Sequence, residues 1–194
     1  AGMDEVTVGV TFTDPAAPRP LPAMDMDPPT ITMNFLPNDS PFVGRDGQFV
    51  TSRHLRERLL RETLSDVALH VEEAPDGTGY AVSGRGELHL SILIERMRRE
   101  GYEFQVGRPH VIGKTENGRD LEPYEQLTVD VAEQHSGTVI EKLGARKGQM
   151  LGMEVENGMT RIVYRMPTRG LLGFRSEFLT DTRGLGVMNY VFSD

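Results

Sequence analysis

The segment LGMEVENGMTRIVYRM, residues 151–166, decides the fold of the second half of the chain. Leu151, Met153 and Val155 alternate with smaller or polar residues, as in a strand with one buried side. Asn157-Gly158 follows, and this dipeptide favours the tight two-residue turn of a β-hairpin. Alternation then resumes. Residues 151–166 are therefore predicted to form two antiparallel strands.

The sequence around this hairpin predicts a strand and a helix before it, and a helix and a strand after it. Apolar residues alternate in the first and last of these segments and recur at helical spacing in the other two. The predicted elements are a strand at 127–131, a helix at 137–147, a helix at 171–180 and a strand at 187–192. Strand, helix, hairpin, helix, strand is the order of the ferredoxin-like βαββαβ fold.

The same order of elements occurs earlier in the chain. A helix capped by Thr51 or Ser52 is expected to run to about Leu64, with Leu55, Leu59 and Leu60 on its apolar side. The other predicted elements are strands at 31–35, 67–73, 80–83 and 102–106 and a helix at 87–100, with a charged connector at 114–120. We therefore predict an α+β protein with two ferredoxin-like βαββαβ domains, residues 27–113 and 114–194. In each, the helices cover one face of the sheet and leave the other open.

The first 26 residues do not fit either repeat. Val6 to Phe12 alternates like a strand and runs into a proline-rich connector. A lone strand without a partner indicates the end of a preceding domain.

Composition excludes several classes of protein. The chain has 194 residues, a net charge of −8 and no cysteine, which excludes disulfides and thiol chemistry. It has neither an apolar run of about 20 residues nor a signal peptide. We expect a cytoplasmic monomer without membrane or DNA partners.

Positive charge is concentrated near the C-terminus. Five arginines between residues 161 and 183 are opposed by two acids, Glu177 and Asp181. The arginines are Arg161, Arg165, Arg169, Arg175 and Arg183. They are candidates for contact with RNA phosphates, with the nearby Gly170 and Gly173 allowing close approach of the backbone. The alternative is an ordinary solvated surface.

The string SGRGELHL, residues 83–90, places two glycines between a strand and a helix. Helix N-termini bind anions, but this string lacks the lysine and third glycine of phosphate-binding loops. Gly84 and Gly86 are better explained by a tight turn, with Glu87 favoured at the positive end of the helix. His89 is expected to be a packed or hydrogen-bonded structural residue. The histidines form no metal-binding or catalytic pattern.

Several long strings resemble BipA/TypA translational GTPases. Ser83, Gly84, Arg85, Gly86, Glu87 and His89 belong to one such string, and Gly170 and Gly173 belong to another, RGLLGFR at 169–175. The remaining matches are NDSPF at 38–42, GQFVTSR at 47–53 and RPHVI at 108–112. Elongation factor G and elongation factor 4 share GELHL, but RGLLGFR is more similar to the BipA form.

This resemblance implies that residues 1–26 end a β-barrel domain and that domains III and V follow. The whole protein would be a ribosome-stimulated GTPase linked to large-subunit assembly and stress adaptation, with rRNA and ribosomal proteins near the factor-binding region as partners. GTP and Mg would bind in a missing N-terminal domain, so these residues alone would have no cofactor and no GTPase activity. The alternatives are a related elongation factor or a small-molecule-binding regulatory module.

Overall fold

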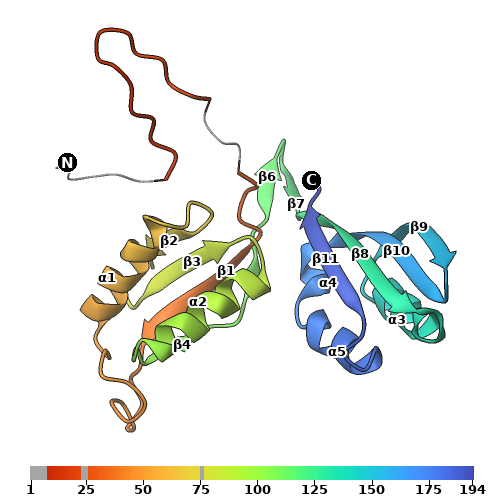
Figure 1. Ribbon diagram of the computed structural model, residues 1–194. Helices are drawn as coiled ribbons and strands as arrows, with labels where there is room; N and C mark the ends of the chain where they lie inside the picture. Colours follow the sequence, from red (N-terminus) through yellow and green to blue (C-terminus); the bar gives the residue numbers. More distant parts are fainter. Residues whose placement is uncertain (1–7, 23–25, 75–76) are drawn as a thin grey trace. The chain divides into compact units, whose positions relative to one another are not determined.

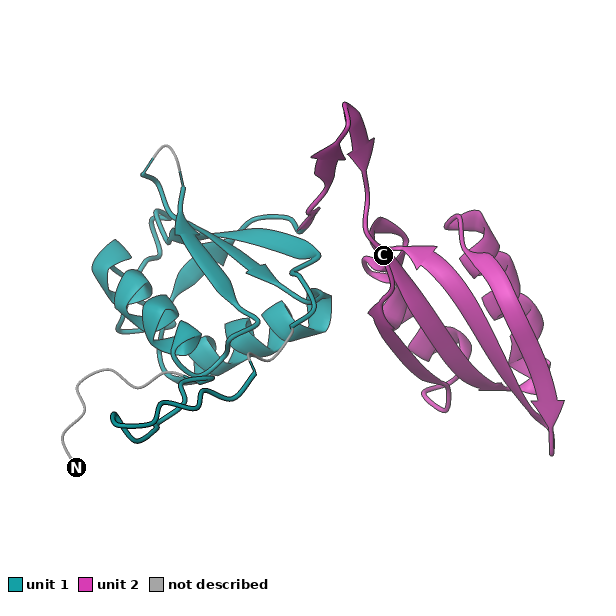
Figure 2. Ribbon diagram, turned by 90° about the horizontal axis from the view of Figure 1, so that it is seen from above, with its two compact units in different colours: residues 1–109 teal, residues 110–194 magenta. Residues whose placement is uncertain are grey.

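The computed structural model describes residues 8–22, 26–74 and 77–194 (Figure 1). The chain divides into two compact units, residues 1–109 and 110–194 (Figure 2). Each unit is described by itself. The domain ranges 27–113 and 114–194 remain a prediction from the sequence.

Unit 1 contains the first predicted βαββαβ repeat. Its sheet has the strand order β2-β3-β1-β4, and every neighbouring pair is antiparallel. The elements are β1 (Ile31–Pro37), α1 (Ser52–Thr63), β2 (His70–Glu73), β3 (Tyr80–Gly84), α2 (Glu87–Arg99) and β4 (Phe104–Val106). This is the strand order of the ferredoxin-like fold, because β3 lies between β1 and β2, the first two strands of the repeat.

The helices of unit 1 begin and end where the sequence indicates. The Thr51 side chain accepts a hydrogen bond from the His54 N–H at 3.2 Å, which caps α1. Gly101 follows α2 with φ +89°, a left-handed conformation that suits glycine. The predicted strand at 67–73 begins only at His70, because a turn at Asp66 precedes it: its side chain accepts the Ala68 N–H at 3.1 Å.

The buried side of α1 differs from the prediction. Leu55 and Leu59 are buried, but Leu60 is 40% exposed, and Arg58 and Glu62 lie inside instead. Arg58 and Glu62 are one turn apart and form an ion pair, so their charges are satisfied within the interface with α2. A count of apolar residues cannot detect a buried ion pair.

Unit 2 contains the second repeat. Its four-stranded sheet has the order β11-β8-β10-β9, again antiparallel throughout. The elements are β5 (His110–Val111), β6 (Lys114–Glu116), β7 (Arg119–Leu121), β8 (Tyr124–Ala132), α3 (Glu133–Ala145), β9 (Gln149–Glu156), β10 (Met159–Pro167), α4 (Thr168–Leu171), α5 (Phe174–Asp181) and β11 (Val187–Phe192). Phe174 and Phe178 pack with Leu127, Ile162 and Leu143 in its core.

The hairpin predicted at 151–166 is confirmed. Asn157 and Gly158 both have positive φ, +52° and +76°, as a two-residue type I′ turn requires. The predicted connector at 114–120 is wrong, because it forms the β6–β7 hairpin around Asn117-Gly118, which also have positive φ. This hairpin carried the same dipeptide signal.

The predicted bounds of the helices in unit 2 differ from those in the structure. Helix α3 begins at Glu133 rather than 137, since its acidic first residue suits the helix N-terminus. The helix predicted at 171–180 is two helices, α4 and α5, because Gly173 adopts φ +70° between them. A left-handed residue interrupts the helical hydrogen bonds.

The strand predicted at 6–12 falls partly outside the described residues. Its described part, residues 8–12, forms no strand, and no described segment before Ile31 pairs with it. A strand needs a partner for its backbone groups. No described helix is both long and apolar enough to cross a membrane.

Candidate RNA-contacting surface

Two of the five candidate arginines lie on β10 and pair with carboxylates on β8 and on the segment after β11. Arg161 donates through Nε and Nη2 to the two carboxylate oxygens of Asp130, at 2.7 and 3.0 Å. Arg165 donates in the same way to Asp194, at 3.2 and 2.6 Å, and lies 3.8 Å from the Tyr124 ring centre. Hydrogen bonding to Arg161 lowers the pKa of Asp130, and hydrogen bonding to Arg165 lowers the pKa of Asp194. Both arginines are thus already neutralised.

Arg169, on α4, is engaged in the same manner. Its Nε and Nη2 donate to the Glu122 carboxylate at 2.6 and 3.3 Å. The three acids that hold these arginines lie 29 to 47 residues away in sequence. The local charge count between residues 161 and 183 therefore missed them, because strand pairing brings distant residues together.

The two acids inside the positive segment, Glu177 and Asp181, pair with cations of α3 or its C-cap. Asp181 lies 2.6 Å from Lys142 Nζ, and Glu177 lies 2.7 Å from Arg146 Nη2. Both cations belong to α3 or its C-terminal cap, so these ion pairs join α5 to α3. Arg146 also donates to the Gly170 and Leu172 carbonyls, at 2.9 and 3.2 Å. The acids on α5 are consequently neutralised from inside the unit.

Arg175 and Arg183 remain exposed, and no described residue forms an ion pair or side-chain hydrogen bond with either. Arg175 and Leu179 lie one turn apart, so they follow one side of α5. Arg183 is not part of the helix and follows its C-cap, Thr182. Glu177 and Asp181 occupy the side that meets α3. We call the exposed residues Arg175, Leu179 and Arg183 the outward stripe of α5. The structure thus separates the predicted arginines into three that pair with acids of unit 2 and two that pair with no described residue.

Gly170 and Gly173 have roles within the fold. A Cβ on Gly170 would lie 2.7 Å from the Arg146 carbonyl oxygen, so the close approach there is to the end of α3. Gly173 provides the left-handed residue between α4 and α5. Neither position requires RNA as an explanation.

The motif at residues 83–90 forms the turn from β3 into α2. The Arg85 N–H donates to His89 Nδ1 at 3.3 Å, and His89 Nε2 lies 2.6 Å from Asp66 Oδ2. A Cβ on Gly84 would meet His89 Nδ1 at 2.9 Å. Both ring nitrogens are occupied, so His89 has no free nitrogen with which to act as a base.

The other residues of this motif are placed around the same turn. Gly86 precedes the first residue of α2, and Glu87 lies in its first turn. Ser83 lies on β3, paired with Thr32 and His70 in the sheet. No group of three potential metal ligands occurs among the described residues.

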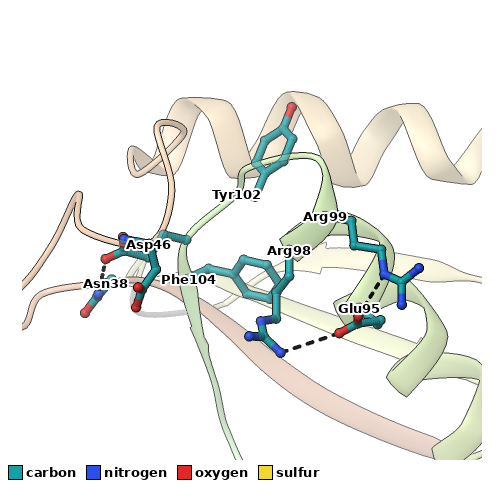
Figure 3. Close-up of a pocket in the computed structure, with 8 residues that line it drawn as sticks. Asn38, Asp46, Glu95, Arg98, Arg99, Tyr102 and Phe104 are labelled. Carbon is teal, nitrogen blue, oxygen red and sulfur yellow. Dashed lines mark hydrogen bonds and ion pairs between the residues drawn. The ribbon is translucent and has the colours of Figure 1, made fainter.

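Sequence reasoning did not identify a cavity of about 360 Å³ beside the end of α2 (Figure 3). Arg98 and Arg99 on its rim both pair with Glu95, at 3.4 and 2.8 Å. Glu103 accepts backbone N–H groups from the loop before α1, including those of Asp46 and Gly47 at 3.0 Å each. These charged groups are satisfied within unit 1, so they do not call for a small-molecule ligand.

Comparison with known proteins agrees with the fold and extends over almost the whole chain. Residues 119–194 match the family described as Elongation factor G C-terminus. Proteins named large ribosomal subunit assembly factor BipA match 99% of the chain, with 51% identity in Synechocystis, 50% in Salmonella typhimurium and 48% in Bacillus subtilis. Almost the whole chain is therefore similar to BipA. It spans about a third of the length of these BipA relatives, 32% in each case.

A solved structure from Thermus thermophilus has the same fold, although its sequence is only distantly similar to that of this chain. It covers 90% of this chain and 41% of its own, with a TM-score of 0.53 and 17% identity. At that identity the likeness concerns the fold alone. The ferredoxin-like architecture expected from the sequence is confirmed, and the half-identical BipA proteins confirm the resemblance found in the sequence.

Proposed function

We propose that this chain is the non-catalytic, ribosome-binding portion of a BipA-type translational GTPase that acts in assembly of the large ribosomal subunit. The name shared by its relatives supports this role. GTP and Mg would bind in another part of the longer protein, since the chain has no G-x-x-x-x-G-K-[ST] sequence. Association with ribosomes also implies a cytoplasmic location.

Within this role, unit 2 contacts ribosomal RNA through the outward stripe of α5. The observation that carries this proposal is the segregation of charge on α5 and directly after it: the acids of α5 pair with cations of α3 or its C-cap, whereas Arg175 and Arg183 have no side-chain partner among the described residues. The guanidinium group forms strong bidentate hydrogen bonds with phosphate. A net charge of −8 makes such binding local rather than general.

The test is co-sedimentation of the 194-residue chain with large ribosomal subunits. The double variant R175E/R183E is expected to bind at least about tenfold more weakly, because two phosphate contacts are replaced by repulsion. R119E is the matched control, since Arg119 lies on the β6–β7 hairpin, away from α5, and is likewise exposed. Equal binding by the double variant and the wild type would contradict the proposal.

A further inference from the structure

Strand β9 is an open edge of the sheet in unit 2 (Figure 1). It is hydrogen-bonded to β10 on one side only, and all eight of its residues are exposed. From Gly152 to Glu156 the pairing with β10 is regular, beyond a bulge near Tyr164. Alternate backbone N–H and C=O groups in this run therefore point to the unpaired side. Such an edge can accept a further strand by main-chain hydrogen bonding.

Apolar side chains line the side of β9 that faces the helical layer. The β10 residues directly opposite Met150, Met153 and Val155 are all buried in the core. These three side chains are nevertheless 44%, 51% and 53% exposed, because α3 packs against β8 and β10 and leaves the edge strand uncovered. Methionine side chains are flexible, so they can adapt to apolar groups of different shapes. This side of β9 is therefore an uncovered apolar row.

The opposite side of β9 is acidic. Glu154 and Glu156 are two residues apart, so their side chains project from the same face of the sheet. Neither forms an ion pair with a residue in the described part of the chain. Arg161, which lies opposite Glu154, is bound by Asp130 through two hydrogen bonds. The two carboxylates are therefore available to a cationic partner, and they would repel RNA phosphate.

The other edges of the two main sheets, all within the described residues, are different. On β11, Met188 and Tyr190 pack against the core, and the strand has no charged residue. On β2, Glu72 and Glu73 are adjacent, so they project from opposite faces, and the apolar Val71 is half-buried. Strand β4 is only three residues long. Lysine or proline often protects a natural edge strand, and β9 contains neither.

We propose that β9 is the docking site for an extended segment of a partner protein in which apolar and basic residues alternate. The segment adds a fifth strand to the sheet of unit 2, and its main chain pairs with the open edge of β9. Its apolar side chains pack on Met150, Met153 and Val155, and its basic side chains pair with Glu154 and Glu156. Alternation places the two kinds of side chain on opposite faces, as the two sides of β9 require.

The charge of β9 favours this occupant over a second copy of the chain. The strand itself has two acids and no basic residue, and the chain has a net charge of −8, so two copies repel each other. The inference goes beyond the proposed function, because it assigns a protein-binding surface to a strand that is separate from the outward stripe of α5.

The test measures fluorescence anisotropy of the 194-residue chain with a labelled, end-blocked peptide of seven residues in which valine and lysine alternate. The wild type is expected to bind this valine-lysine peptide at low salt. A peptide with glutamate in place of lysine is expected to bind at least about tenfold more weakly, because each charge pair becomes a repulsion. Equal binding of the two peptides, or no binding of either, would overturn the inference.

Main-chain pairing is tested by changing the peptide alone, which leaves the protein intact. Along a strand, the N–H groups of the lysines point to one edge and those of the valines to the other. One peptide is therefore N-methylated at its lysines and another at its valines. One of the two is expected to lose at least about tenfold in affinity, and the other to bind like the unmethylated peptide. Equal affinities of the methylated peptides would contradict strand addition.

Substitutions of the acids locate the site on the protein. E154K/E156K is expected to bind the valine-lysine peptide about tenfold more weakly than the wild type. E72K/E73K makes the same change of charge on β2, the edge strand of unit 1, and is expected to bind like the wild type. Both pairs are exposed, so unchanged thermal unfolding is expected for each variant. Equal effects of the two variants would show that the peptide responds only to net charge and would overturn the site.

The apolar row has its own variant. M153S/V155S keeps the charge of β9 and is expected to weaken peptide binding by about tenfold, because it removes apolar contact. Analytical ultracentrifugation of the chain without peptide is expected to show a monomer. A dimer that M153S/V155S dissociates would assign β9 to a second copy and overturn the inference. R175E/R183E is expected to bind the peptide like the wild type, so failure of this inference and failure of the proposed RNA contact are separate results.

Discussion

At the scale of single residues, the stability of unit 1 depends on a buried guanidinium. Arg58 is 4% exposed and donates to both oxygens of Glu100 and to Glu62, while Arg96 donates to the other oxygen of Glu62. The hydrogen bond to Glu100, and to a smaller extent the one to Glu62, raises the pKa of Arg58, although burial alone would lower it. The network joins α1 to α2 through charges that all have partners.

Removing that guanidinium should be costly. R58A is expected to lower the free energy of unfolding by about 3 kcal/mol or more, because Glu62 would keep a buried charge with one partner fewer. Urea denaturation at neutral pH measures it. R53A is the control on the same helix, since Arg53 is exposed and pairs only with Glu57. Similar small effects of both variants would show that the network does not stabilise the fold.

The Arg161–Asp130 pair makes a prediction about pH. Hydrogen bonding to Arg161 holds the pKa of Asp130 below its ordinary value. The pair therefore stabilises the folded state at pH values above the ordinary pKa of aspartate. This stabilisation is lost as pH falls through the lower pKa that Asp130 has in the folded state. R161Q is therefore expected to be less stable than the wild type near neutral pH, with the difference disappearing in acid. A constant difference across pH, measured by urea denaturation, would contradict the assignment.

At the scale of elements, the ends of α3 and α5 store strain that glycine would relieve, because Lys147 and Arg183 there have φ +68° and +52°. A non-glycine residue in the left-handed conformation costs roughly 1–2 kcal/mol, of which a cation at a helix C-terminus recovers about 0.3–1 kcal/mol. K147G and R183G are each expected to raise the free energy of unfolding by up to about 1 kcal/mol. Thermal unfolding followed by circular dichroism measures this. A lower melting temperature for either variant would show that the strain is absent.

The elements also show what sequence can and cannot predict. The hairpin at Asn157-Gly158 and the cap at Thr51 depend on neighbouring residues, and both are confirmed. Three of the candidate arginines, by contrast, are held by acids from distant parts of the sequence, which local charge does not reveal. The left-handed conformation of Arg183 gave no signal in the sequence, because arginine seldom adopts a positive φ.

At the scale of the whole molecule, each unit has its own sheet, its own helical layer and its own buried residues. Residues 110–194 are therefore expected to fold alone. Calorimetry of that fragment should give a single cooperative transition whose calorimetric and van't Hoff enthalpies agree. A broad transition without such agreement would show that unit 2 depends on unit 1.

The proposed contact between the outward stripe of α5 and ribosomal RNA is best tested by its salt dependence. Binding of the chain to large ribosomal subunits should be measured over a salt series for the wild type, R175E/R183E and R119E. Log affinity falls linearly with log salt concentration, and each lost phosphate contact makes this slope shallower by about 0.7–0.9. We expect R175E/R183E to make the slope shallower by about 1.5 and R119E to leave it unchanged. Parallel slopes for all three proteins would show that Arg175 and Arg183 do not bind phosphate.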